Sequence, residues 1–114
     1  MRERLNRAIH PLVRREVDRW FASLDDAIGV VEAALLVETG AWRTYDVLVV
    51  VGCGPDQQRR RALARGLSAA EVEAILTAQA PLAEKMDTAQ VVIDNSGSPE
   101  DLVAEVERAW TEVL

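Results

Sequence analysis

The chain is 114 residues long, 49% hydrophobic and acidic, with a formal net charge of −6. This length allows a single domain over 1–114 with a small core, and the negative charge argues against general nucleic-acid binding. No apolar run approaches the roughly 20 residues that cross a membrane, and the N-terminus leads into no signal-peptide apolar region, so we expect a cytoplasmic protein with neither a membrane nor a nucleic-acid partner.

The charge is unevenly distributed along the chain. Residues 1–65 contain 11 arginines against 9 acidic residues, a balance of plus two. Residues 66–114 contain only Lys85 and Arg108 against 10 acidic residues, a balance of minus eight. A local anion site is therefore expected in the first part. The single cysteine, Cys53, excludes an internal disulfide and is expected to be a small, partly buried side chain.

The first predicted elements are one helix and two strands. Apolar residues at near-helical spacing predict an amphipathic helix over 4–23, which Pro11 should break or restart because proline lacks an amide donor. Residues 28–31 and 47–51 are short β-branched runs that are apolar on both faces, as strands of a buried parallel sheet are. The segment between them fits a helical or irregular crossover.

Helical spacing returns in the second half of the chain, after Pro55. Ser68 predicts a helix start, because its hydroxyl can cap the helix while Glu71 reaches back as the third helical residue. A third apolar run at 91–93 predicts another short strand.

The last predicted helix also has a clear start signal. Ser98 precedes Pro99, which lies at the first helical position, where its missing donor costs least. Leu102, Val106 and Trp110 follow at spacings of four and should form one apolar face. The alternation of helices and strands along the chain predicts an α/β fold with a parallel sheet.

A candidate phosphate site lies in the helix after the second strand. Gln58, Arg61 and Arg65 fall at spacings of three and four, so they share one helix face. Paired arginines on such a face can bind phosphate oxygens in a bidentate manner. On spacing alone, a solvated basic face is the more common explanation.

A second candidate site follows the third strand. Asp94-Asn95-Ser96-Gly97 begins where that strand ends, and open α/β sheets bind ligands outside the carboxyl ends of their strands. A glycine in such a turn lets the backbone approach a ligand closely. An Asx turn that leads into the capped helix explains the same residues without a ligand.

Three motifs follow one another at fixed intervals: GLS at 66–68, AQAP at 78–81 and VIDNSGS at 92–98. Together they resemble the C-terminal half of the dephospho-coenzyme A kinases, P-loop enzymes that phosphorylate the ribose 3′-hydroxyl of dephospho-coenzyme A. The resemblance implies a partial P-loop-kinase-like parallel sheet of about three short strands, with flanking helices and a helical lid over 56–88. It also implies ATP and dephospho-coenzyme A as ligands, and Mg²⁺ as a cofactor.

The resemblance assigns roles to the two candidate sites. In the family, a glutamine and two arginines recur before a GLS-type turn, and they match Gln58, Arg61 and Arg65. Because the family's lid arginines approach the ATP phosphates, Arg61 and Arg65 are the expected catalytic residues. The family's I-D-N-x-G loop lies against adenine, so Asn95 and Gly97 are expected to bind the nucleotide.

Two further matches lie in the first part of the chain. The segment Ile9-His10-Pro11-Leu12-Val13 fits a family element near the acceptor substrate, which makes His10 a candidate substrate contact; a satisfied, partly buried histidine is the common alternative. The segment 32–40 resembles the family's D-x-P-L-L-F-E-x-G, with Glu32 in place of its aspartate. A carboxylate at a strand end can bind Mg²⁺. Glu32 is therefore the candidate metal ligand, and Glu38 is expected to be structural or on the substrate side.

The matching half includes no phosphate-binding loop. The only lysine, Lys85, lies in no G-x-x-x-x-G-K-S/T pattern, and the family's aspartate base has no counterpart here. We therefore expect the C-terminal part of a dephospho-coenzyme A kinase, inactive alone and lacking its N-terminal half. The alternatives are a degenerate domain that binds a nucleotide or coenzyme A without catalysis, and an interaction module whose open sheet edge pairs with another chain. We also expect the isolated fragment to self-associate, because the missing half would leave strand edges and apolar surface exposed.

Overall fold

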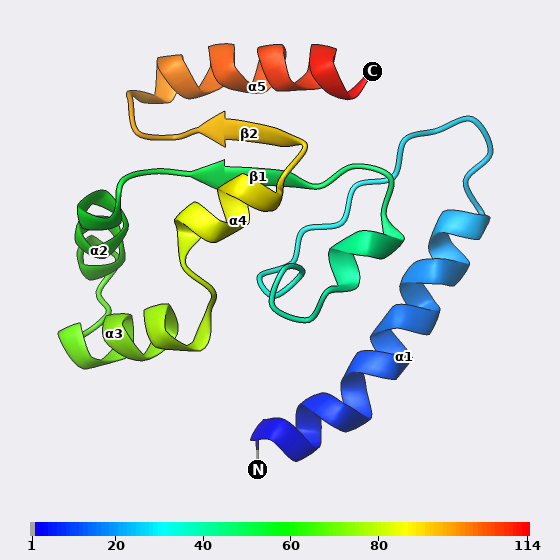
Figure 1. Ribbon diagram of the computed structural model, residues 1–114, viewed down its shortest axis with the longest axis horizontal. Coiled ribbons are helices and arrows are strands. Elements are labelled where there is room, and N and C mark those ends of the chain that lie inside the picture. The colour runs from blue at the N-terminus through cyan, green and yellow to red at the C-terminus, as the bar shows by residue number, and fades with distance from the viewer. Residues whose placement is uncertain (1) are drawn as a thin grey trace. The chain divides into compact units, whose positions relative to one another are not determined.

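The structure, a computed structural model, describes residues 2–114 (Figure 1). The chain forms two compact units, of which the first ends at Glu32 and the second comprises Ala33–Leu114. Both strands belong to the second unit. No helix among residues 2–114 has the length and hydrophobicity to cross a bilayer. The expectation that 1–114 act as one domain remains a prediction.

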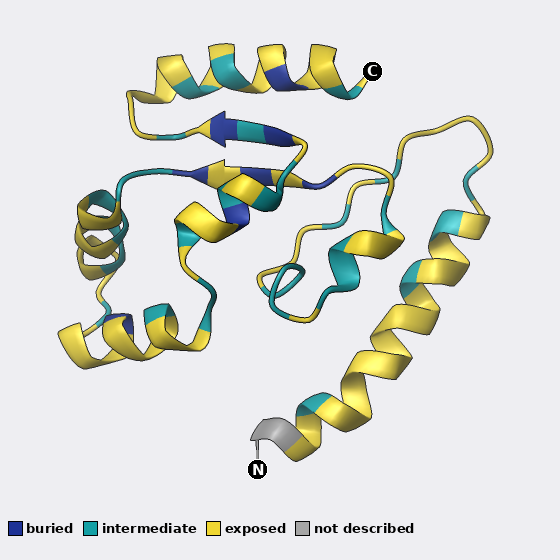
Figure 2. Cartoon of the chain, viewed as in Figure 1, coloured by how far each residue is buried: buried dark blue, intermediate teal, exposed yellow. Residues whose placement is uncertain are grey.

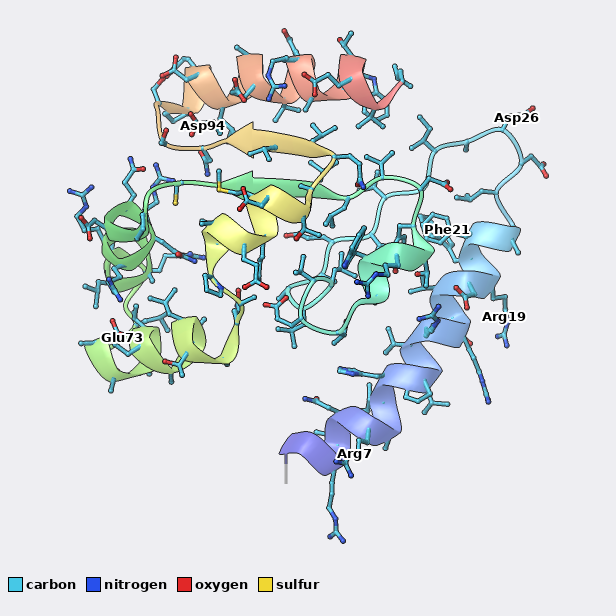
Figure 3. All side chains as sticks on the ribbon, viewed as in Figure 1. Arg7, Arg19, Phe21, Asp26, Glu73 and Asp94 are labelled. Carbon is cyan, nitrogen blue, oxygen red and sulfur yellow. The ribbon has the colours of Figure 1, made fainter. Side chains whose placement is uncertain are left out.

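The first unit consists mainly of one helix, α1, Arg2–Ala22. Pro11 lies inside this helix without ending it, so the expected break at Pro11 is wrong. Proline removes only the hydrogen bond to the carbonyl four residues earlier, that of Arg7. Arg7 lies on an exposed part of α1, where water can satisfy this carbonyl (Figure 3).

Residues 28–31 form no strand, which corrects the second expectation for this unit. A strand requires a neighbour for its hydrogen bonds. The first unit contains α1 and a turn but no second strand that could pair with 28–31. The β-branched composition of this run is therefore not enough to form a strand. Ile28 and Val30 are exposed.

The second unit contains the sheet and the remaining helices. Its elements in chain order are the 3-10 helix η1 Ala41–Thr44, β1 Val49–Gly52, α2 Pro55–Ala64, α3 Ala69–Ala78, α4 Leu82–Thr88, β2 Val91–Asp94 and α5 Pro99–Val113. The α/β class with a parallel sheet is confirmed, although the sheet has two strands rather than three. Three helices occupy the segment 56–88, for which the lid is predicted.

The two strands run in parallel, with Val49 opposite Val91 and Gly52 opposite Asp94. Both therefore end at the same edge of the sheet. At this edge the turn after β1 leads into α2, and the turn after β2 leads into α5. α5 packs on β2, and α4 packs on β1 (Figure 1).

The core of this unit lies between β2 and α5 (Figure 2). It consists of Val91, Ile93 and Ala109, with Leu102 and Val113 packed against them. Val106 and Trp110, which were expected to share the apolar face with Leu102, are 47% and 48% exposed. The small side chain of Ala109 faces the strand instead, so the buried face of α5 is rotated from the one that the larger residues indicate.

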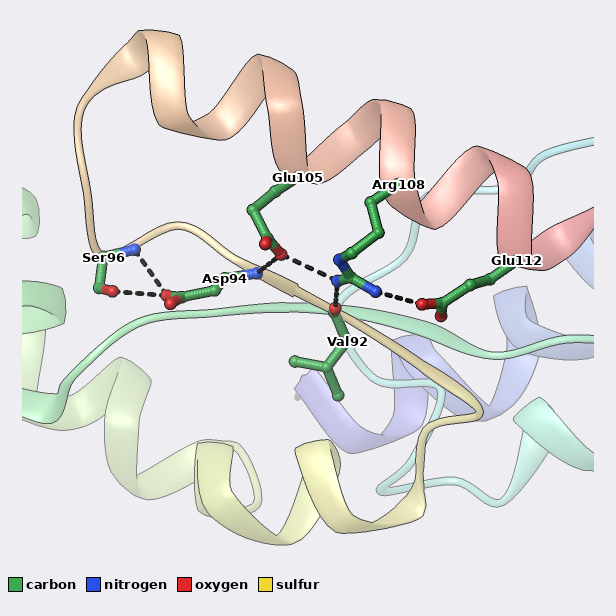
Figure 4. Close-up of polar contacts among 6 residues, drawn as sticks. All are labelled: Val92, Asp94, Ser96, Glu105, Arg108 and Glu112. Atoms are coloured by element: carbon green, nitrogen blue, oxygen red, sulfur yellow. Dashed lines mark hydrogen bonds and ion pairs between the residues drawn. The ribbon is translucent and has the colours of Figure 1, made fainter.

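The outer edge of β2 is closed by side chains of α5 (Figure 4). Arg108 Nη2 donates to Val92 O at 2.6 Å, and Asp94 N donates to Glu105 Oε2 at 3.1 Å. Arg108 also donates to the carboxylates of Glu105 and Glu112. These contacts satisfy backbone groups that a further strand would otherwise use. Within the described residues, no strand pairs with β2 on this side.

The outer edge of β1 has no such cover among residues 2–114. The carbonyl of Gly52 points toward β2, where it accepts from Asn95 N. Successive residues of a strand direct their backbone N–H and C=O groups to opposite sides, so those of Val49 and Val51 point away from β2. In the described chain these groups form no hydrogen bond beyond the β1–β2 ladder, and the side chains of Val49 and Val51 are 39% and 54% exposed. An edge of this kind can accept another strand.

Candidate functional site

The candidate site lies at the edge where β1 and β2 end, the edge at which open α/β sheets bind ligands. The turn 94–97, which begins at Asp94, meets side chains of α2 there (Figure 3). One predicted phosphate ligand, Arg61, and one predicted base ligand, Asn95, belong to this junction. These two residues are 34 positions apart in the chain.

The turn 94–97 is held first by its own side chains. Ser96 N and Ser96 Oγ both donate to Asp94 Oδ1, at 2.9 and 2.5 Å (Figure 4). These hydrogen bonds lower the pKa of Asp94 below its ordinary value, because they stabilise the carboxylate. The Asx turn that the sequence predicts as a ligand-free explanation is therefore present.

Side chains of α2 hold the next two carbonyls of this turn. Arg61 Nη1 donates to Asn95 O at 2.6 Å, and Gln57 Nε2 donates to Ser96 O at 2.7 Å. Gln57 and Arg61 are four residues apart, so they lie on the same face of α2. The structure thus brings Arg61 to the backbone of Asn95, a contact that the sequence does not predict.

Asn95 extends its side chain from this fixed turn. The residue is partly buried, and its side-chain amide forms no hydrogen bond within residues 2–114. A carboxamide has one acceptor oxygen and two donor hydrogens. These groups are free for a ligand, and the base-binding role of Asn95 remains a prediction.

Arg65 lies one helical turn after Arg61, at the C-terminal cap of α2. It is exposed, and its guanidinium has no ion pair or hydrogen bond in the described chain. The next residue, Gly66, has a φ of 96°, a left-handed conformation that ends α2. α3 is joined to α2 by the ion pair of Arg59 and Glu73, at 2.9 Å. The catalytic roles of Arg61 and Arg65 remain predictions.

Gly97 lies directly against the start of α5. A Cβ atom added to Gly97 would come within 2.5 Å of Asp101 Oδ2 and 3.1 Å of Asp101 Cβ. Asp101 and Ser98 form a capping box, in which Ser98 N donates to Asp101 Oδ2 and Asp101 N donates to Ser98 Oγ, at 3.0 and 3.1 Å. A glycine is therefore required here by the helix cap, and its predicted contact with a nucleotide remains untested.

We predict that Gly97→Ala destabilises the protein by about 1 kcal/mol, the typical contribution of a helix cap. The new methyl group would displace the Asp101 carboxylate from Ser98. Thermal unfolding of this variant and of wild type measures the effect. In an Asp101→Ala background the same substitution should cost much less, because the displaced carboxylate is already absent. Equal losses in the two backgrounds would contradict this explanation.

His10 and Glu32 belong to the first unit. His10 lies on α1 and is exposed rather than partly buried, and Glu32 is also exposed. Within residues 2–114, no three side chains of His, Cys, Asp or Glu come together as they would in a metal centre. A substrate contact of His10 and a metal contact of Glu32 remain predictions.

A cavity of about 510 Å³ lies between α2, α3 and α4. Its lining includes Cys53, Gln58, Arg59, Gln79 and Lys85. Cys53 follows β1 directly and is partly buried, as expected. Gln58 lines this cavity, whereas Arg61 contacts the turn 94–97, so these two members of one sequence motif serve different parts of the site.

Lys85 forms a nearly buried ion pair with Glu38. The Lys85 Nζ to Glu38 Oε2 distance is 2.7 Å, and the two side chains are 11% and 16% exposed. Lys85 Nζ also donates to Ala34 O and Gln79 Oε1, at 3.2 and 3.1 Å. Glu38 Oε2 accepts from Ala80 N at 3.0 Å. This cluster ties the segment before η1 to the junction between α3 and α4.

Glu38 is stabilised as a carboxylate in this cluster. Burial opposes ionisation, but hydrogen bonds from Lys85 and from the backbone amides of Glu38 and Ala80 lower the pKa of Glu38 below its ordinary value of 4.5. Sequence reasoning did not assign a role to Lys85. The sequence contained one signal for a special role of Lys85, which is the only lysine among the 13 lysine and arginine residues of the chain.

Comparisons with known proteins agree on one family. A family model described as dephospho-CoA kinase matches residues 1–101. A curated dephospho-CoA kinase from Geobacter sulfurreducens is 42% identical over 113 residues, which cover 96% of this chain and 57% of the relative. For the dephospho-CoA kinase of Frankia casuarinae the identity is 36% over 114 residues, covering 99% of this chain and 50% of the relative. The chain therefore spans about half the length of the curated relatives it matches.

A solved structure supports the same conclusion for the fold. The crystal structure of TT1252 from Thermus thermophilus matches this chain with a TM-score of 0.81 and 33% sequence identity. The match covers 98% of this chain and 59% of TT1252.

Proposed function

Because this chain belongs to the dephospho-CoA kinase family, we propose that it supplies the base-binding turn and the lid of an enzyme that phosphorylates dephospho-CoA with ATP. The observation that carries the proposal is the turn 94–97, which Gln57 and Arg61 fix at the carboxyl edge of the sheet. It presents the side-chain amide of Asn95, which has no partner within residues 2–114, beside the helix that carries Arg61 and Arg65. A ligand with both a base and phosphates fits this arrangement.

In the proposed reaction, the 3′-hydroxyl oxygen of dephospho-CoA attacks the γ-phosphorus of ATP. A P–O bond forms to that oxygen, the bond to the β-phosphate oxygen breaks to give ADP, and the hydroxyl proton passes to a base. The charge of the transferring group must be neutralised. Arg65 is an exposed cation for this purpose, and Arg61 keeps guanidinium donors beyond the one that holds Asn95.

Mg²⁺ belongs to the proposal as the cation that accompanies ATP. The carboxylate of Glu32 has the right chemistry for a hard cation. However, no other side chain of a ligating type joins Glu32 within the described residues, so these residues alone do not form a magnesium site. We assign no step of the reaction to Glu32. We place the proposed enzyme in the cytoplasm, with dephospho-CoA and ATP as its ligands.

The open edge of β1 supports a larger sheet in the working enzyme. A further parallel strand at this edge would pair with the backbone of Val49 and Val51 and cover their side chains. We propose that this strand comes from the part of the enzyme that carries the phosphate-binding loop. Self-association through the same edge is the competing outcome, and the oligomeric state of the natural polypeptide, rather than that of the 114-residue chain alone, distinguishes the two.

Titration of the 114-residue chain with ATP, followed by NMR, tests the base-binding part of the proposal. We expect the side-chain amide of Asn95 and the backbone amides of Ser96 and Gly97 to shift at millimolar ATP. Shifts confined to other segments would contradict this site. Micromolar binding of ATP or CoA without turnover would instead favour the second candidate, a binding domain without catalysis, for which the missing G-x-x-x-x-G-K-S/T pattern is the supporting observation.

A further inference from the structure

We propose that Gln57 is a positioning residue for the nucleotide base, because its side-chain amide joins the turn after β1 to the turn after β2 and so fixes the turn that presents Asn95. The inference rests on the proposed function. It adds to the site a residue that lies beside the recognised motif and that no sequence pattern indicates.

Gln57 bridges the two turns with one planar group. Its Oε1 accepts from Gly54 N at 3.2 Å, and its Nε2 donates to Ser96 O at 2.7 Å. Gly54 follows β1 and Ser96 follows β2, so the bridge spans the carboxyl ends of both strands. Gln57 lies in the first turn of α2 and is partly buried.

Gln57 holds the one peptide group of the turn that nothing else fixes. The other groups are held by the strand ladder, by the side chain of Asp94 and by Arg61. Ser96 O accepts only from Gln57 within residues 2–114. Loss of this bond would free the peptide between Ser96 and Gly97, and glycine restricts its backbone less than any other residue.

A loosened turn should weaken the binding of the nucleotide and leave the rate of phosphoryl transfer unchanged. A ligand that binds an ordered turn loses less conformational entropy than one that must order it. Gln57 touches neither the proposed phosphate ligand Arg65 nor the lid helix α3 through any hydrogen bond. The expected signature is therefore a higher KM for ATP, with kcat and the KM for dephospho-CoA nearly unchanged.

Two substitutions separate positioning from folding stability. Gln57→Leu removes both hydrogen bonds. Gln57→Glu keeps an acceptor for Gly54 N but places a carboxylate against Ser96 O, while a negative charge in the first turn of a helix favours folding. The unfolding temperature of each variant, measured beside the kinetics, separates an effect on ATP binding from a loss of folded protein. Arg60→Gln, at an exposed position of the same helix, is the matched control.

Steady-state kinetics of the natural polypeptide that carries this chain should show a KM for ATP about fivefold higher in both Gln57 variants, the effect of about one neutral hydrogen bond. Arg60→Gln should behave as wild type. Amide hydrogen exchange should also become faster at Asn95 and Ser96 in both Gln57 variants, and stay unchanged in α5.

An unchanged KM for ATP in both variants would overturn the inference, and so would equal rises in the KM for both substrates. Unchanged exchange at Asn95 and Ser96 would overturn it as well. A wild-type polypeptide without kinase activity would overturn the proposed function instead, and the exchange rates would still decide whether Gln57 holds the turn.

Discussion

Replacement of Arg65 by alanine should slow phosphoryl transfer on the order of a hundredfold or more, by analogy with other lost transition-state donors. Arg65 is exposed at the end of α2 and has no partner in the described chain. An exposed arginine contributes little to stability, so the unfolding temperature of Arg65→Ala should remain near that of wild type. Turnover and thermal unfolding of the natural polypeptide measure the two effects separately.

Arg61→Ala should give a different pattern from Arg65→Ala. Arg61 Nη1 holds the carbonyl of Asn95, so its removal should lower turnover and also raise the KM for ATP. Arg60→Ala, on the same helix, should change neither value. Near wild-type turnover in both the Arg61 and Arg65 variants would show that the lid assignment is wrong.

Lys85→Met should have the largest effect on stability. It leaves the carboxylate of Glu38 without its cation in a nearly buried site, and a broken buried ion pair typically costs about 3 to 5 kcal/mol. This is a large share of the roughly 5 to 15 kcal/mol that stabilise a typical domain. Denaturant unfolding of the 114-residue chain measures the loss. The double variant Lys85→Met/Glu38→Leu should recover most of it, because no unpaired charge remains.

The pH dependence of the stability difference between wild type and Lys85→Met provides an independent check on the role of the ion pair. The pKa of Glu38 is lower in the folded protein than its ordinary value of 4.5, so its contribution to wild-type stability is complete above pH 4.5 and is lost as the pH falls further. In Lys85→Met, protonation of the unpaired Glu38 relieves the destabilisation. The difference in stability between the two proteins should therefore shrink in acid. A constant difference would show that the ion pair is not its cause.

Local signals in the sequence predicted two helix starts and the two strands of the second unit. Ser68 and Ser98 cap α3 and α5, as their positions indicate. A side chain that caps a helix acts within four residues, so its effect can be read from neighbouring residues alone. The short apolar runs 47–51 and 91–93 predicted two strands of a parallel sheet, and the structure pairs them with each other.

Features that depend on distant partners were not predicted. The run 28–31 has the composition of a strand but no partner within its unit. Ala109 occupies the buried face of α5 in place of Val106 and Trp110, and this face is set by the packing of α5 on β2. The contact of Gln57 with Ser96 joins residues that are 39 positions apart, and no local pattern encodes it.

Formation of CoA from dephospho-CoA and ATP by the natural polypeptide tests the central claim most directly. We expect ATP-dependent product with one equivalent of ADP, the new phosphate on the ribose 3′-hydroxyl, and the loss of most turnover in Arg65→Ala. The 114-residue chain alone should form no product, because it has no phosphate-binding loop. Binding of both ligands by the natural polypeptide without any CoA formed would contradict the account.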